Sequence, residues 1–240
     1  MDKEKVLIVG GSSGMGLSLA RSLLADGAAV VIAGRSPDRL ARARAALADV
    51  GDVQAVAADI AREDDVIRLF GACGQLDHIV STAADIEGAY ALLPELELAA
   101  AHRVFASKFF GPWLLAKHGS SRLAPNASIT FTSGIAACRP APRGSVVAGV
   151  NGALASLAYA LAVELAPIRV NVVSPGWVDT PIWQQVAGEE AAARLDAMAQ
   201  KLPVGRIGRP DDIADGIRFL MRNGFTTGSV LHVDGGHRLV

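Results

Sequence analysis

The sequence contains few residues of the kinds that mark secreted, metal-binding or nucleic-acid-binding proteins. Only two of its 240 residues are cysteines, Cys73 and Cys138, and they lie far apart. This predicts two reduced thiols in a cytoplasmic protein, with neither a disulfide framework nor a cysteine metal site. Lysine and arginine number 23 against 24 acidic residues. Because the charges balance, the sequence offers no general basic field for nucleic acid or an anionic membrane.

The apolar runs look short, about the length of a strand, so we expect no transmembrane helix and no membrane partner. The first five residues lead directly into a strand-like run, which leaves no room for a signal peptide. No histidine spacing indicates a metal ligand pair, so no metal is expected. We expect the five histidines at the surface or in a subunit interface: His78, His102, His118, His232 and His237.

Apolar runs and helical segments alternate along the whole chain, which predicts an α/β domain with a parallel sheet and helices on both faces. Residues 1–240 read as one domain, and residues 181–202, rich in alanine, are interpreted as a flexible substrate flap after the sixth strand. The expected strands are 6–9, 28–33, 53–57, 78–81, 128–132, 169–173 and 230–233. The expected helices are 17–26, 37–47, 63–73, 98–118, 146–165 and 211–221.

A glycine-rich turn, Gly10-Gly11-Ser12-Ser13-Gly14-Met15-Gly16, joins the first strand to the first helix. Glycine permits a tight turn and a close backbone approach, and the start of a helix attracts phosphate. A plain strand-to-helix turn is the alternative. Its place at the start of a βα series favours binding of a dinucleotide.

The second strand ends in Gly34-Arg35-Ser36. A protein that binds NAD usually places an acidic residue here for the ribose hydroxyls, whereas arginine suits the 2′-phosphate of NADP. Ser36 adds a hydroxyl group. We therefore predict NADP(H) as the cofactor, and the alternative is a solvated arginine. Further arginines are expected on the solvent side of the next helix: Arg39, Arg42 and Arg44.

Four segments in chain order resemble those of the short-chain dehydrogenase/reductase family. They are the glycines Gly10, Gly14 and Gly16, the pair Asp59-Ile60, the loop Pro175-Gly176-Trp177-Val178-Asp179-Thr180 and the strand ending Asp234-Gly235-Gly236. The resemblance implies a Rossmann-type doubly wound sheet of about seven strands, with the cofactor at its carboxyl edge. It also implies a homo-oligomer, a tetramer or a dimer, and a substrate flap that includes Trp183.

Together with the interpretation of Arg35 and Ser36 above, the resemblance predicts a set of cofactor-binding residues, spread over seven parts of the chain. These are Gly10, Ser12, Ser13, Gly14, Met15, Gly16, Arg35, Ser36, Asp59, Ile60, Thr82, Ala83, Ala84, Lys108, Thr132, Pro175, Gly176, Trp177, Val178 and Thr180.

The sequence departs from the family at the residues that carry its chemistry. The family's Asn-Asn-Ala-Gly segment is Ser81-Thr82-Ala83-Ala84 here, and Ser133 stands one place before the usual catalytic serine. Val147 takes the place of the catalytic tyrosine and Asn151 that of the lysine. Valine cannot donate a proton, so ordinary carbonyl reduction loses its general acid.

Lys108 occupies the position of the family's asparagine, so lysine and asparagine look exchanged. One interpretation is that Lys108 restores an ammonium near the ribose and the substrate oxygen, and that Asn151 helps to anchor Lys108 or a water. The other is an ordinary solvated lysine. Its aromatic neighbours Phe109, Phe110 and Trp113 are expected in the core or a subunit interface, and Arg139 and Arg143 in exposed loops.

Two functions remain open. The first is an NADP(H)-dependent oxidoreductase for a small carbonyl or alcohol, with Ser133, Lys108 and Asn151 as catalytic residues. The second is a non-catalytic NADP(H)-binding sensor or regulatory module, because the acid is missing while the binding loop is kept. A lyase or epimerase on the same fold is a weaker third possibility.

Overall fold

In the computed structural model, which describes residues 3–240, all strands belong to one parallel sheet. The order is β3-β2-β1-β4-β5-β6-β7, so the chain reverses direction across the sheet between β1 and β4. This confirms the predicted doubly wound fold. The strands are β1 (Lys5–Val9), β2 (Ala29–Gly34), β3 (Val53–Ala57), β4 (Leu76–Ser81), β5 (Leu123–Thr132), β6 (Arg169–Pro175) and β7 (Val230–Val233).

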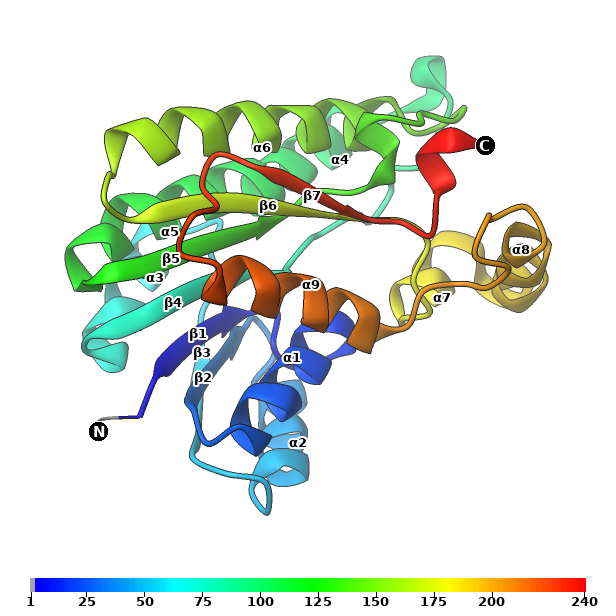
Figure 1. Ribbon diagram of the computed structural model, residues 1–240. Coiled ribbons are helices and arrows are strands. Elements are labelled where there is room, and N and C mark those ends of the chain that lie inside the picture. The colour runs from blue at the N-terminus through cyan, green and yellow to red at the C-terminus, as the bar shows by residue number, and fades with distance from the viewer. Residues whose placement is uncertain (1–2) are drawn as a thin grey trace.

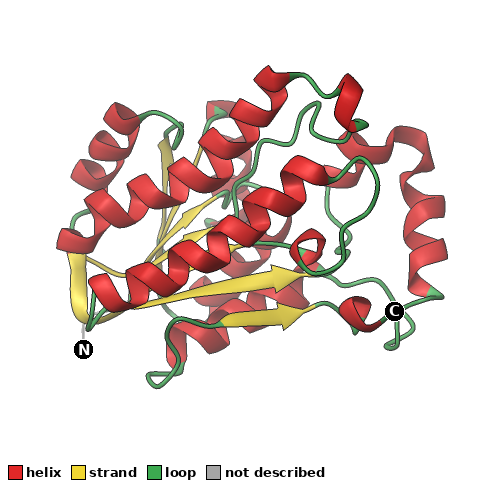
Figure 2. Cartoon of the chain, turned by 90° about the horizontal axis from the view of Figure 1, so that it is seen from above, coloured by secondary structure: helices red, strands yellow, loops and turns green. Residues whose placement is uncertain are grey.

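Helices cover both faces of the sheet (Figure 1). Helices α1, α2 and α9 pack on one face, and α3, α5 and α6 pack on the other. The view from above shows helices on both sides of the strands (Figure 2). The helices are α1 (Gly14–Ala25), α2 (Pro37–Leu47), α3 (Glu63–Cys73), α4 (Leu98–Phe105), α5 (Gly111–Gly119), α6 (Ser145–Glu164), α7 (Ile182–Ala187), α8 (Ala191–Ala199) and α9 (Pro210–Arg222).

The central strands are apolar on both sides because each side meets a helical layer. In β1, Leu7 and Val9 face the layer of α3, α5 and α6, whereas Val6 and Ile8 face the layer of α1 and α9. All four side chains are fully buried. The pattern fixes β1 at the centre of the sheet, and its carboxyl end therefore opens at the reversal point, where doubly wound folds bind ligands.

The expected helix 98–118 is interrupted by a π-helical turn, Ala106–Phe110. The Gly111 N–H donates to the Ala106 carbonyl, a bond that spans five residues. Pro112 follows and has no N–H to donate, so a regular α-helical ladder cannot run through this point. The extra residue rotates Ser107 and Lys108 inward, and both are buried.

Helix α6 overturns the expectation that every apolar run is of strand length. It has 20 residues, and it is the one helix among residues 3–240 that is long and apolar enough to cross a membrane by length and composition. Its Leu154, Ala158 and Leu161 side chains lie in the core against the sheet. A helix packed in the core of a domain can be as long and as apolar as a membrane-spanning helix. The position of these three side chains accounts for the apolar face that meets the sheet.

The segment interpreted as a substrate flap folds into α7 and α8 beyond the carboxyl edge of the sheet (Figure 1). Neither helix contains a fully buried residue. Its flexibility stays a prediction, but its position over the carboxyl edge agrees with a covering role. The chain end, a short turn at His237–Leu239, lies at this same edge.

Candidate active site

Two adjoining cavities open at the carboxyl edge of the sheet. The first has a volume of about 200 Å³ and lies over the ends of β1, β2 and β4. The second has a volume of about 690 Å³ and lies over β5 and β6, below α7 and α8. Five residues line both cavities, which therefore form one continuous cleft: Met15, Thr82, Ala84, Thr180 and Ile182.

The glycine turn needs glycine for two different reasons. Gly10 and Gly14 have φ angles of 90° and 51°, in the left-handed region that side chains disfavour. A Cβ on Gly16 would overlap the Gly10 carbonyl oxygen and lie 2.7 Å from Thr82 Oγ1. Gly10 and Gly14 line the first cavity, whereas Gly16 lines neither. Gly16 therefore serves the close packing of α1 on the strands rather than direct contact with a ligand.

Helix α1 begins at the first cavity with its first N–H groups available. Ser13 precedes the helix, but its side chain makes no capping hydrogen bond. The free N–H groups and the helix dipole favour an anion at this point. The turn therefore fits a dinucleotide pyrophosphate, as its sequence predicts.

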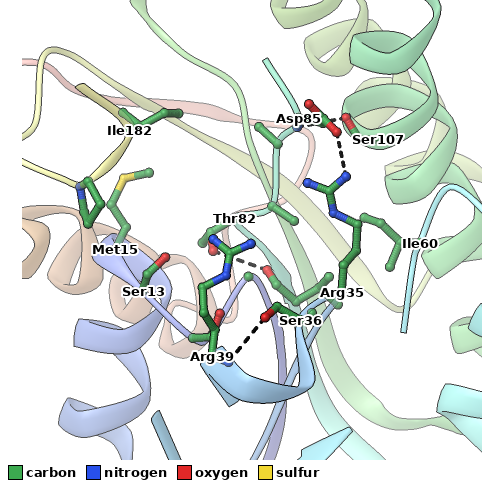
Figure 3. Close-up of a pocket in the computed structure, with 18 of the residues that line it drawn as sticks. Ser13, Met15, Arg35, Ser36, Arg39, Ile60, Thr82, Asp85, Ser107 and Ile182 are labelled. Atoms are coloured by element: carbon green, nitrogen blue, oxygen red, sulfur yellow. Dashed lines mark hydrogen bonds and ion pairs between the residues drawn. The ribbon is translucent and has the colours of Figure 1, made fainter. Parts of the chain in front are cut away.

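A cluster of charged side chains closes the far end of the first cavity (Figure 3). Arg35 Nη1 lies 2.6 Å from Asp85 Oδ2, and Ser36 Oγ accepts a hydrogen bond from the Arg39 N–H at 3.3 Å. Burial opposes ionisation of Asp85. The hydrogen bonds from Arg35 and the Glu87 N–H outweigh burial and hold the pKa of that carboxyl below its usual range.

Arg39 and Asp85 line this cavity although the sequence analysis gave neither a binding role. Arg39 lies in the first turn of α2, which begins at Pro37 directly after the end of β2, so it stays at the same sheet edge as Arg35. Closeness to the end of β2 is a signal that the sequence does contain. Asp85 follows β4, and only the strand order, with β1 between β2 and β4, brings it to Arg35.

Asp59 and Ile60 form the wall expected to hold the adenine. Asp59 Oδ1 accepts a hydrogen bond from the Ala61 N–H at 3.0 Å, which fixes the loop after β3. Ile60 is buried, and a Cβ on Gly111 would meet its side chain. Both residues line the first cavity, in agreement with the prediction.

The loop after β6 forms the floor of the second cavity. The Trp177 and Trp183 rings lie 4.3 Å apart between centroids, and Trp183 Nε1 donates to the Val178 carbonyl at 2.8 Å. A Cβ on Gly176 would lie 2.8 Å from Asp234 Cα. The Asp234-Gly235-Gly236 segment thus supports this loop from behind. Every residue predicted here lines the cavity: Pro175, Gly176, Trp177, Val178 and Thr180.

Lys108 is buried in the second cavity wall, which excludes the solvated alternative. Its Nζ donates to the carbonyls of Thr132 and Ser133, at 3.0 and 3.1 Å. Burial disfavours the ammonium and lowers the pKa of Lys108 to about 8. No hydrogen bond joins Lys108 to Asn151 among the described residues, so the structure does not show Asn151 anchoring Lys108, and the alternative, that Asn151 holds a water, stays a prediction. The end of β5 anchors Lys108 instead.

The other two predicted catalytic residues also line this cavity. The Ser133 hydroxyl donates to the Asn151 carbonyl at 2.9 Å, so its proton is already engaged. Asn151 Oδ1 and Thr132 Oγ1 are buried and, within residues 3–240, accept no hydrogen bond. These two oxygens are unsatisfied acceptors beside Lys108, and a ligand or water with a proton to donate would complete them.

Val147 lines the second cavity and is buried against an apolar cluster that includes Ile86 and Val104. It offers no proton. Of the side chains lining the cavity within residues 3–240, Tyr90 carries the one phenol, and the sequence analysis missed it. Tyr90 is 41% exposed, and the desolvation of its ring within the cavity raises its pKa, so it does not gain acidity from this position. Lys108, whose pKa is lowered, is the better-matched acid near neutral pH.

Comparison with known proteins agrees with this geometry. A family model described as enoyl-(acyl carrier protein) reductase matches residues 9–238. The short-chain dehydrogenase/reductase malC of Malbranchea aurantiaca is 36% identical over 97% of this chain and 94% of its own. The chain belongs to the short-chain dehydrogenase/reductase family.

One further relative and two solved structures are similar to this chain over nearly its whole length. A cis-4-hydroxycyclohexanecarboxylate dehydrogenase of Sinomonas cyclohexanicum is 36% identical, over 99% of this chain and 98% of its own. The structure of MalC Reductase/Diels-Alderase superposes with a TM-score of 0.92 at 34% identity, covering 99% of this chain and 97% of that one. The crystal structure of a small-chain dehydrogenase in complex with NADPH superposes with a TM-score of 0.78, at 34% identity over the whole of both chains.

Membership makes this protein a short-chain oxidoreductase that uses a nicotinamide cofactor and acts on small molecules. The cleft agrees with that assignment because the first cavity has the glycine turn and the second has the loop after β6. The family's tyrosine and lysine positions, as aligned from the sequence, hold Val147 and Asn151 in the second cavity wall.

Several secondary expectations were wrong. His78 is buried, with Nδ1 2.7 Å from Ser128 Oγ and Nε2 2.9 Å from Glu4 Oε1. His237 is also buried, edge-on to Trp177, so these two histidines are not at the surface. Arg139 and Arg143 are both exposed, as expected, and Arg139 also lines the second cavity, whereas Arg143 lines neither cavity.

The aromatic group near Lys108 divides between core and surface. Phe109 packs against the apolar cluster of Val147, as expected of a core residue. Phe110 is 54% exposed and Trp113 is 40% exposed. The core interpretation therefore holds for Phe109 alone of the three.

Proposed function

We propose that this protein is an NADP(H)-dependent oxidoreductase that interconverts a small carbonyl compound and its alcohol. The observation that carries the proposal is the cationic end of the first cavity, where Arg35, Ser36 and Arg39 follow β2. An NAD-binding site would place an acidic residue at that strand end. The structural relative in complex with NADPH supports the same cofactor.

The described residues fit this cofactor from one end to the other. Asp59 and Ile60 would hold the adenine, the N-terminus of α1 the pyrophosphate and the loop 175–180 the nicotinamide. When bound, the nicotinamide supplies or accepts a hydride. Gly10 and Gly14 keep the turn free of side chains, so the backbone N–H groups reach the phosphates.

Lys108 would carry the proton chemistry in place of the missing tyrosine. Its ammonium is held by the Thr132 and Ser133 carbonyls at the wall of the second cavity. Two of its three N–H donors are engaged in this way, which leaves one for a substrate oxygen. Asn151 Oδ1 would accept from a water or an alcohol substrate. The contacts with Lys108 and Asn151 would place the substrate oxygen beside the ammonium that donates the proton.

The affinities for the two cofactors test the proposal. Arg35→Ala should weaken NADPH binding at least about tenfold, because a charge-assisted hydrogen bond to the 2′-phosphate is lost, and leave NADH nearly unchanged. The control is Arg42→Ala, which removes an exposed arginine of α2 that lines neither cavity. Equal NADPH affinity in Arg35→Ala and parent would reject the cofactor assignment.

The alternative is a non-catalytic NADP(H) sensor, motivated by Val147 at the position aligned with the tyrosine. NADPH oxidation with a panel of aldehydes and ketones separates the two functions. Turnover with any member supports the oxidoreductase. Tight NADPH binding with no turnover over the whole panel supports the sensor.

We also propose that the protein assembles with copies of itself. Large apolar side chains lie exposed on the outer helices of one face, with Phe110 and Trp113 around α5 and Tyr159 and Val163 on α6. Light scattering of the purified protein tests this, and a monomer at micromolar concentration would contradict it.

A further inference from the structure

We propose that the second cavity selects substrates that are apolar but carry an anionic group, such as an aromatic or alicyclic keto acid. The proposal rests on the oxidoreductase function above and adds the class of its substrate. It comes from the charges that line the cavity, which no cofactor contact explains.

The lining of the second cavity is strongly one-sided in charge. Its side chains include two arginines, two lysines and a histidine but, within residues 3–240, no aspartate or glutamate, and the carboxylate of the last residue, Val240, is the one acidic group on its lining. The whole chain, by contrast, has nearly equal numbers of basic and acidic residues. Low-dielectric walls lined by one sign of charge concentrate a ligand of the other sign. The side chains that can carry a positive charge are Lys108, Arg139, Arg194 and Lys201, and His237 when it is protonated.

These cations do not serve the cofactor phosphates. The glycine turn and the Arg35 cluster line the first cavity, and none of the five residues named above does. Lys108 is held at the end of β5, where the reaction is proposed to occur. Arg194 is neutralised by Glu190, which accepts hydrogen bonds from its Nε and Nη2 at 3.1 and 2.7 Å.

Arg139 and Lys201 are left with uncompensated charge. Neither forms a hydrogen bond or ion pair through its side chain with any described residue from 3 to 240. Arg139 comes from the loop between β5 and α6, and Lys201 follows α8. Two segments distant in sequence therefore bring free cations to the same cavity.

His237 provides an independent observation, because one of its ring nitrogens is a buried polar atom without a hydrogen-bond partner among the described residues. It is 8% exposed, lines the cavity, and its Nδ1 is buried with no hydrogen-bond partner among the described residues. Burial lowers the pKa of His237, the Asp234 carboxylate opposes this, and the charge of Arg139 adds to the lowering. The neutral ring therefore has an unused polar atom close to Arg139, as expected beside a polar ligand group.

Apolar residues also line this cavity, and they determine what the uncharged part of the substrate can be. Ile86, Val147, Val186 and Met198 surround the space, and the Trp177–Trp183 pair forms one wall. The nearest carboxylate behind this wall, Asp234, is turned inward and accepts from the Gly236 and Arg238 N–H groups. A hydrophobic ring with a carboxylate toward Arg139 and a carbonyl toward Lys108 matches these walls.

Binding of a matched pair of ligands tests the proposal without turnover. The probes are 4-acetylbenzoate and its uncharged analogue 4-acetylbenzamide, each titrated against the protein saturated with NADP⁺. Quenching of tryptophan fluorescence reports binding, because Trp177 and Trp183 line the cavity and Trp113 does not. We expect the acid to bind at least about tenfold more tightly than the amide, since only the acid forms charge-assisted hydrogen bonds.

Substitutions identify the source of the preference. Arg139→Gln should remove most of the preference for the acid and leave the affinity for the amide unchanged. Arg143→Gln is the matched control, because Arg143 lies in the same loop and lines neither cavity. Equal affinity for both probes in the parent, or equal effects of the two substitutions, would overturn the proposal. Selective binding of the acid, with no oxidation of NADPH when NADPH replaces NADP⁺ in the same mixture, would uphold this inference and count against the proposed reaction instead.

Discussion

At the scale of single residues, Asp85 would compete with a bound phosphate for the guanidinium of Arg35. Arg35 is half exposed and would bind a phosphate, yet in the structure it is engaged by a carboxylate that itself lines the cavity. A phosphate entering this space must share Arg35 with Asp85. The strength of NADPH binding therefore reflects the phosphate contact minus the repulsion from Asp85.

Asp85→Asn removes that repulsion and keeps the size of the side chain. We expect NADPH to bind roughly three- to tenfold more tightly and NADH to bind no more tightly, a change of about 1 kcal/mol for a partly exposed pair. Fluorescence titration of both cofactors measures this, with Glu87→Gln, an exposed neighbour, as control. Weaker NADPH binding in Asp85→Asn would mean that Asp85 positions Arg35 instead of opposing the phosphate.

The lowered pKa of Lys108 predicts the pH dependence of carbonyl reduction. A proton donor acts in its protonated form, and burial brings the pKa of Lys108 to about 8. The rate constant kcat/KM for reduction should therefore be highest below this pH and fall as the pH rises through it. Lys108→Met should abolish this dependence and lower kcat/KM by about 10²-fold or more, the usual contribution of a general acid.

The test needs a variant that still folds and a control for the other possible proton donor. Methionine has a similar length and no charge, and burial already disfavours the ammonium, so Lys108→Met should remain folded. Tyr90→Phe removes the phenol that lines the same cavity and should leave the pH profile unchanged. If Tyr90→Phe changes the profile and Lys108→Met does not, the proton comes from Tyr90.

Residue types alone could predict much of the cofactor site but little of the substrate site. The glycines and Arg35 follow strands directly, and a parallel sheet brings all strand ends to one edge. Tyr90, Arg139, Lys201 and His237 lie in loops or turns whose paths no local pattern determines. Their convergence on one cavity becomes visible only in the folded chain.

At the scale of elements, the contact between α1 and the central strands depends on Gly16. A Cβ there would overlap the Gly10 carbonyl oxygen and press on Thr82 Oγ1 at 2.7 Å. Both atoms belong to the edge of the sheet that holds the glycine turn. The helix would have to move away from β1 and β4, and the turn would move with it.

Gly16→Ala should therefore lower the free energy of unfolding by about 1–3 kcal/mol, as overpacking does elsewhere, and weaken NADPH binding. Urea unfolding measures the first effect. Gly71→Ala is the control because a Cβ on Gly71, in α3, meets nothing within 4 Å. There the same substitution should raise stability by about 0.5–1 kcal/mol. A neutral Gly16→Ala would contradict the packing role assigned to this glycine.

The sequence predicts the strands better than it predicts the interruption of the helix before Pro112. The five inner strands are largely buried from both sides, so hydrophobicity alone reveals them, whereas the edge strands β3 and β7 contain no fully buried residue. The π-helical turn at Ala106–Phe110 was not predicted. Pro112 signals some interruption, but the sequence does not say whether the helix kinks, ends or gains a residue there. That choice decides that Lys108 faces inward.

At the scale of the whole molecule, the cleft is assembled from nearly every part of the chain. The glycine turn, the ends of β2 and β4, the π-helical turn and the loop after β6 all contribute to its walls. Unfolding any of these segments destroys the site. A cofactor that bridges them binds the folded state and not the unfolded chain, so its binding free energy adds to global stability.

This linkage predicts the thermal behaviour of the protein. NADPH at about 100 times its Kd should raise the free energy of unfolding by about 2.7 kcal/mol, which is about 5–10 °C in Tm for a domain of this size. Differential scanning fluorimetry measures the shift. NADH at the same concentration should give a smaller shift, since it lacks the phosphate that Arg35 would bind. In Arg35→Ala the two cofactors should give similar shifts. Equal shifts in the parent would show that the end of β2 does not discriminate between them, and the preference for NADP(H) would have to be abandoned while the rest of the cleft could still hold NAD(H).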